Sequence, residues 1–117
     1  MRVVLGVVLG LCIAPVALAR TMAVVGTTPA ENAVVSPENA QYSVRFDGLV
    51  DHNGSTLTIT QGDQVVATLH ALLNAAPNTL FAMGPRLGAG DYRLRWAVRS
   101  QPDGEMTEGS VAFSVRK

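Results

Sequence analysis

The chain has 117 residues, with nine Lys and Arg against nine Asp and Glu, so its formal net charge is zero. A balanced charge of this kind gives no reason to expect binding to nucleic acid or to an anionic membrane. Only 15% of the residues are charged, while valine and threonine are frequent, and this composition favours β-strands.

The chain opens with a segment typical of a secretory signal peptide. Arg2 is followed by an apolar run that Pro15 interrupts, and residues 17–19 (Ala-Leu-Ala) match an A-x-A cleavage site. The run is short for a membrane span, so we expect cleavage at the end of this motif rather than a membrane anchor. The sequence therefore predicts a signal peptide at residues 1–19 and a mature domain at residues 20–117.

The predicted cleavage changes the inventory of reactive groups. Cys12, the only cysteine, leaves with the signal peptide, so the mature domain has neither a disulfide nor a thiolate ligand. Arg2 also leaves, and eight basic against nine acidic residues give a net charge of −1. The remaining 98 residues, 117 minus 19, suffice for one domain with one core. We expect this domain to be a monomer that does not insert into a membrane.

Short stretches of alternating apolar and polar residues recur along the mature chain, separated by glycine, proline and asparagine. This spacing predicts an all-β domain, an immunoglobulin-like or Greek-key sandwich of about seven strands. Gln61-Gly62-Asp63 predicts a hairpin between its flanking strands. Residues 70–76 favour a helix of one or two turns, which Pro77 ends. The expected strands cover residues 21–28, 33–35, 41–47, 56–60, 65–70, 80–83, 91–100 and 110–116.

The segment 91–116 carries the clearest pattern. Along its first strand, large apolar side chains alternate with a row that holds three arginines, which points one row to the core and the other to water. Trp96 lies on the inward row and is expected to be the central aromatic of the core. A polar turn over 101–109, containing Asp103-Gly104, joins this strand to the next. The inward residues are Tyr92, Leu94, Trp96 and Val98, and the outward residues are Arg93, Arg95, Ala97 and Arg99.

The same segment resembles a known family. Residues 87–96 (LGAGDYRLRW), then Ser100 and Asp103-Gly104, then the alternation over 109–115, resemble the CopC family of periplasmic copper-binding proteins. In that family the pattern is roughly L-P-A-G-x-Y-x-V-x-W, followed by S-x-D-G-H and G-x-F-x-F-x-V. Residues 27–33 (TTPAENA) resemble the family's S-x-P-A-x-G-A near the mature N-terminus. The resemblance implies an all-β sandwich in the periplasm.

The resemblance also implies a Cu(II) site built from a histidine at the mature N-terminus, an aspartate and the histidine of D-G-H. Such a set suits Cu(II), because a terminal amine and imidazoles chelate it in a square plane. Asp103 matches the aspartate. Glu105 stands in place of the D-G-H histidine, and Thr21 aligns with the N-terminal one. We therefore place the candidate copper site at Asp103 and Glu105, and expect it to be altered or weakened.

Other residues could contribute to a metal site. Glu108 adds a third carboxylate to the predicted turn. The alternative is that this turn is an ordinary solvated turn that binds no metal. His52 lies in an exposed turn where Asp51 could orient its ring, and His70 ends a strand on the outward side. Each histidine alone is more often a surface residue than a ligand, but the two could converge in space.

No pattern in the sequence indicates an enzyme. The serines lack a G-x-S-x-G motif, and no glycine-rich phosphate loop precedes a helix. The leading prediction is a periplasmic copper-homeostasis protein of CopC type, and the resemblance implies an inner-membrane copper transporter as its partner. The alternative is a copper-free β-sandwich interaction module that has lost the metal site. The residues favouring that alternative are Thr21 and Glu105, where histidines are expected.

Overall fold

The computed structural model describes residues 22–73, 75–101 and 103–117. The predicted signal peptide at residues 1–19 lies outside these ranges. Within them the chain forms eight β-strands and no helix, and therefore no helix long and apolar enough to cross a membrane. The strands are β1 (Val24–Thr28), β2 (Ala33–Val35), β3 (Gln41–Phe46), β4 (Thr56–Gln61), β5 (Gln64–Leu69), β6 (Thr79–Met83), β7 (Gly90–Arg99) and β8 (Met106–Val115).

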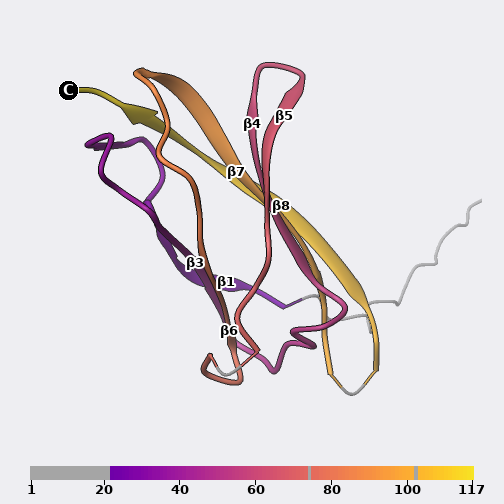
Figure 1. Ribbon diagram of the computed structural model, residues 1–117. Coiled ribbons are helices and arrows are strands. Elements are labelled where there is room, and N and C mark those ends of the chain that lie inside the picture. Colours follow the sequence, from indigo (N-terminus) through magenta and orange to yellow (C-terminus); the bar gives the residue numbers. More distant parts are fainter. Residues whose placement is uncertain (1–21, 74, 102) are drawn as a thin grey trace, which may run out of the picture.

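The strands form two sheets that pack face to face (Figure 1). One sheet has three strands in the order β1-β3-β6, and the other has five in the order β2-β8-β7-β4-β5. All neighbouring strands are antiparallel except β2 and β8, which run parallel. The chain passes between the two layers several times, as a sandwich requires. The predicted all-β sandwich is confirmed.

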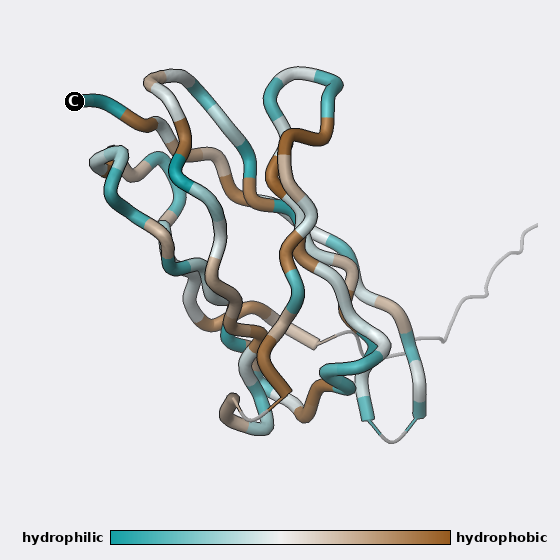
Figure 2. Tube along the Cα trace, in the orientation of Figure 1, coloured by the Kyte–Doolittle hydropathy of each residue, from teal (hydrophilic) through white to brown (hydrophobic). Residues whose placement is uncertain are grey.

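The core follows the period-two pattern of the sequence. Hydrophobic residues recur along the strands between polar ones (Figure 2), and the apolar row of each long strand faces the opposite sheet. Trp96 is 7% exposed and its ring meets Phe46 edge-on, with centroids 6.4 Å apart. The predicted outward arginines of β7 are exposed. The most buried large side chains are Tyr42, Val44, Phe46, Leu57, Ile59, Leu80, Leu94, Val98, Phe113 and Val115.

Strand β8 begins earlier than the sequence predicts. The expected polar turn over 101–109 is shorter, because residues from Met106 onward pair with β7 in a register that sets Trp96 opposite Gly109. Opposite residues of an antiparallel pair point to the same face. A Cβ on Gly109 would lie 2.6 Å from Cζ2 of Trp96, so the missing side chain is what lets the indole lie flat over β8. The polar residues before Gly109 are therefore strand, not turn.

The predicted short helix over 70–76 is wrong. The described residues of this segment are loop and turn, and the backbone N–H of Leu72 donates to the carbonyl of Phe81 at 2.8 Å. The segment carries the chain from β5 in one sheet to β6 in the other. Its helical propensity is too small, over so few residues, to outweigh this crossing.

The predicted hairpin between β4 and β5 is confirmed, with Gly62 at φ 60° in its turn. A register shift between Ile59 and Thr60 interrupts the pairing. Val65 and Val66 on the near side of the shift are both exposed, while Leu69 is buried in the core and Ala67 packs against it.

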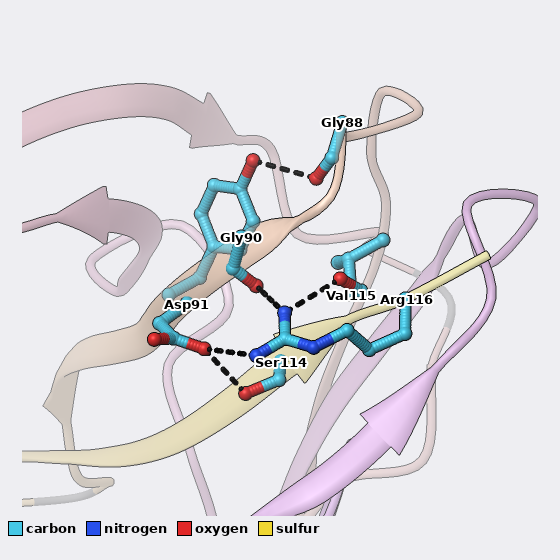
Figure 3. Close-up of polar contacts among 7 residues, drawn as sticks. Gly88, Gly90, Asp91, Ser114, Val115 and Arg116 are labelled. Atoms are coloured by element: carbon cyan, nitrogen blue, oxygen red, sulfur yellow. Dashed lines mark hydrogen bonds and ion pairs between the residues drawn. The ribbon is translucent and has the colours of Figure 1, made fainter.

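The start of β7 is tied to the loop before it and to the end of β8 (Figure 3). The hydroxyl of Tyr92 donates to the carbonyl of Gly88 at 2.8 Å, in the manner of the tyrosine corner of immunoglobulin-like domains. Asp91 accepts hydrogen bonds from Ser114 at 2.8 Å and Arg116 at 3.0 Å, which hold the pKa of its carboxyl below the usual value. Because Asp91 is exposed, this ion pair orients the strand ends and adds little stability.

Candidate functional site

The two predicted site residues, Asp103 and Glu105, lie in the turn that joins β7 to β8, and both side chains are exposed. The turn is closed by backbone hydrogen bonds from Gly104 N to Ser100 O and from Ser100 N to Glu105 O, each 2.9 Å long. Gly104 has φ 74°, a conformation that glycine adopts without the steric cost of a Cβ. The predicted role of Asp103-Gly104 as turn formers is confirmed.

The carboxylate of Asp103 is itself part of this turn. Its Oδ1 accepts a short 2.6 Å hydrogen bond from the Ser100 hydroxyl and a longer 3.4 Å bond from the backbone N–H of Glu105. The Ser100 hydroxyl, followed by the Glu105 N–H, holds the pKa of Asp103 below its usual 3.8. Ser100 is buried, which fixes the donor in place. One oxygen of the principal candidate ligand is therefore already engaged.

Replacing Ser100 should release this carboxylate. In Ser100→Ala the largest stabiliser of the charged form is gone, so we expect the pKa of Asp103 to rise toward 3.8, as followed by NMR titration of the side-chain carboxyl carbon. The pKa of Asp103 is lower in the folded protein than in the unfolded chain. Its contribution to the free energy of unfolding is therefore fully present above the unfolded pKa and is lost as the pH falls through the folded pKa. Ser110→Ala, whose hydroxyl accepts from Arg93 instead, is the control. An unchanged Asp103 pKa in Ser100→Ala would contradict the hydrogen bond.

A positive charge also lies beside the turn. Nη1 of Arg99 donates to the carbonyl of Gly104 at 3.4 Å, so its guanidinium lies against the turn that carries Asp103 and Glu105. Glu108 does not join them, because it lies in β8 opposite Ala97. The structure thus brings together two of the three predicted carboxylates. The alternation along the strand predicts only that Arg99 faces water. Its position immediately before the turn was the signal that could have linked it to the turn.

The described chain begins close to this turn. The N–H of Ala23 donates to Oδ1 of Asp47 at 2.9 Å, and Met22 packs over Gly48, with its Sδ 3.1 Å from the point that a Cβ on Gly48 would occupy. The next residue, Leu49, accepts a 3.0 Å hydrogen bond from the N–H of Gln101. The first described residues and the β7–β8 turn therefore lie at the same end of the sandwich. Thr21, the residue aligned with the N-terminal histidine, lies outside the described residues.

The two histidines lie elsewhere at this end. Nε2 of His52 lies 3.1 Å from the carbonyl oxygen of Ala76 and 2.9 Å from that of Thr79. Oδ1 of Asp51, which could have oriented the ring, accepts instead from the backbone N–H groups of Asn53 and Gly54. His70 is exposed, as its outward place predicts. His52 and His70 both line one surface hollow of about 260 Å³.

Metal ions need ligand sets that converge on one point. Within residues 22–73, 75–101 and 103–117, no group of three or more His, Cys, Asp or Glu side chains is placed to hold a metal ion.

Comparison with known proteins decides the family. The family model for the CopC domain matches residues 24–116, almost the whole described chain. The chain belongs to the CopC family. CopC proteins are periplasmic and bind copper, and they are not known as enzymes. The resemblance that the sequence indicates is thereby confirmed.

Solved structures agree with this assignment. The crystal structure of CopC from Methylosinus trichosporium OB3b matches with a TM-score of 0.74 and 27% sequence identity, over 81% of this chain and 93% of that one. An engineered protein of known crystal structure shares the fold alone, with a TM-score of 0.59 and 20% identity, over 83% of this chain and 20% of its own. No curated protein matches the sequence.

The family pattern implies a Cu(II) site at the β7–β8 turn. The described residues at this turn of the CopC chain do not fit that ion. Imidazole is a preferred donor for that ion, and the turn offers carboxylates, which suit harder cations. One oxygen of Asp103 is held by Ser100, and the guanidinium of Arg99 lies beside the turn. Copper held at the inherited position would have to compete with both.

Proposed function

We propose that this chain is a periplasmic copper-homeostasis protein of CopC type whose Cu(II) site at the β7–β8 turn is altered and weakened. One observation carries the proposal. The turn keeps the aspartate of the family pattern, while Glu105 replaces its histidine and Asp103 is held in an internal hydrogen bond. After export and removal of the signal peptide, the mature domain would comprise residues 20–117. It would act without catalysis beside an inner-membrane copper transporter.

The family framework supports the copper-related part of the proposal. The match to the CopC domain spans both sheets, and the two long strands that carry the turn are intact over ten residues each. The fold also places the start of the described chain next to the turn, where the family's N-terminal ligand belongs. A weakened site suits a protein that releases copper readily, because fewer strong donors mean faster loss of the ion.

The turn can be tested by restoring the missing imidazole. Signal-free protein, residues 20–117, with both native histidines changed to glutamine is titrated with Cu(II) and followed by d–d absorption and Trp96 fluorescence. We expect weak binding that Glu105→His strengthens by about tenfold or more, the scale on which metal-site partners act. Asp103→Ala in the Glu105→His protein should remove that gain.

The control is Glu108→His, which places an imidazole on β8 away from the turn. An equal gain from both histidines would show non-specific binding and contradict the proposal. No gain from Glu105→His would instead favour a copper-free interaction module, the function suggested by the internal bonding of Asp103 and the neighbouring Arg99. Export and cleavage are tested separately, by N-terminal sequencing of the secreted protein, which should begin at Arg20.

A further inference from the structure

The two histidines of the chain are far apart in sequence, but the fold places both on one hollow. His52 lies in the loop before β4, and His70 directly follows β5. Because β4 and β5 pair antiparallel with Leu57 opposite Leu69, the loop that precedes β4 and the residue that follows β5 lie at the same end of this hairpin. The remaining wall of the hollow is formed by Asn53, Ser55, Thr56, Thr68, Ala71 and Leu73, with Leu69 beneath them.

The hydrogen bonds of His52 define which of its nitrogens is available. Both atoms near Nε2, the carbonyl oxygens of Ala76 and Thr79, can only accept, so Nε2 carries the hydrogen. In the neutral ring, Nδ1 then holds the lone pair. Histidines that bind metals almost always donate their other ring N–H to a carbonyl, a carboxylate or a water, which fixes the tautomer and the ring plane. His52 is already held in this way by the backbone.

No lysine or arginine is among the described residues that line the hollow. Arg99, which donates to the Gly104 carbonyl of the turn, also packs against Gly54 in the His52 loop, next to Oδ2 of Asp51. His70 is exposed and lies at a strand end, so its side chain can change rotamer to meet an ion held by the other ring. The hydroxyls and amide on the wall are neutral, and they allow water to complete a coordination sphere.

We propose that His52 and His70 form a two-imidazole site for a divalent first-row transition metal of the Cu(II) or Zn(II) type. Imidazole suits both ions, and water fills the remaining positions. The site is separate from the β7–β8 turn and does not depend on copper binding there. This chain lacks the histidine of the family's D-G-H motif. Its two histidines would instead bind the metal in the hollow, at the same end of the sandwich as the turn.

The test uses residues 20–117 with the terminal amine acetylated, because a free amino terminus binds Cu(II) by itself. Cu(II) alone is titrated and followed by electron paramagnetic resonance, and Zn(II) alone is followed by imidazole nitrogen shifts in NMR. The spectra should show two imidazole nitrogens on one ion. His52→Gln and His70→Gln should each weaken binding by about tenfold or more. Glutamine at position 52 keeps an N–H donor for the Ala76 and Thr79 carbonyls, so the loop remains in place.

Matched variants separate this site from the turn. In Asp103→Asn the signal of two imidazole nitrogens on one ion should persist, and an unchanged melting temperature in His52→Gln shows that the loss is not unfolding. Binding that survives both glutamine variants, or that depends on one histidine alone, overturns the two-imidazole site. Binding lost in Asp103→Asn but kept in the glutamine variants would overturn it as well, while supporting a copper site at the turn.

Discussion

Phe113→Ala is expected to lower the free energy of unfolding by about 3–5 kcal/mol, the usual cost of truncating a buried phenylalanine. Phe113 is 2% exposed and lies on β8 at the centre of the core. Its ring stacks on Tyr92 with centroids 5.7 Å apart, and contacts Tyr42 from the opposite sheet at 6.1 Å. Truncating Phe113 therefore removes packing contacts between the two sheets. It also leaves a cavity that neither tyrosine can fill without moving.

This loss is a large part of the total stability of a domain of this size, which is about 5–15 kcal/mol. Urea unfolding measured by circular dichroism gives the change directly, and the melting temperature should fall by more than about 10 °C. Val65→Ala is the control, because Val65 is 61% exposed and should change stability by no more than about 0.5 kcal/mol. A loss below about 1 kcal/mol in Phe113→Ala would show that this ring does not join the sheets.

Gly109→Ala is expected to destabilise the domain by about 1–3 kcal/mol, the cost of overpacking a filled core. The new Cβ would lie 2.6 Å from Cζ2 and 2.9 Å from Nε1 of Trp96. Within the described residues that Nε1 is buried and has no hydrogen-bond partner, so packing alone holds the indole. Because the ring also contacts Phe46 in the other sheet, it cannot retreat without disturbing the core.

Trp96 is the only tryptophan, so its fluorescence reports the displacement together with the unfolding curve. We expect the emission maximum to shift as the indole moves, and the unfolding midpoint to fall. Gly88→Ala is the matched control, since nothing lies within 4 Å of its added Cβ. Equal stability of the two alanine variants would mean that the indole does not depend on the missing side chain at position 109.

The framework of the domain and its candidate metal residues are physically separate. Tyr92, Trp96 and Gly109 match the family pattern and serve the packing of the two sheets, so changes at these positions alter stability. Asp103 and Glu105 point from an exposed turn, where the backbone conformation depends on Gly104 and on hydrogen bonds of the main chain. A substitution such as histidine to glutamate at position 105 can therefore change metal affinity while the sandwich stays folded.

Much of the fold could be predicted because it depends on local alternation. Period two along residues 91–100 identifies the buried row, including Trp96, since successive side chains of a strand must face opposite sides. The same alternation places the arginines in water, and the local chemistry of Asp103-Gly104 identifies the turn. Family membership also follows from the sequence, because the residues that carry the pattern are those that the core and the turns require.

The tertiary structure decided the properties that arise from pairing between distant segments. The register that sets Trp96 opposite Gly109 moves residues 106–109 from turn to strand, and the crossing between sheets prevents a helix over 70–76. The tautomer of His52 depends on carbonyls more than twenty residues away. Local propensity carries no information about such partners, because the free energy that selects them comes from contacts formed only when the two sheets come together.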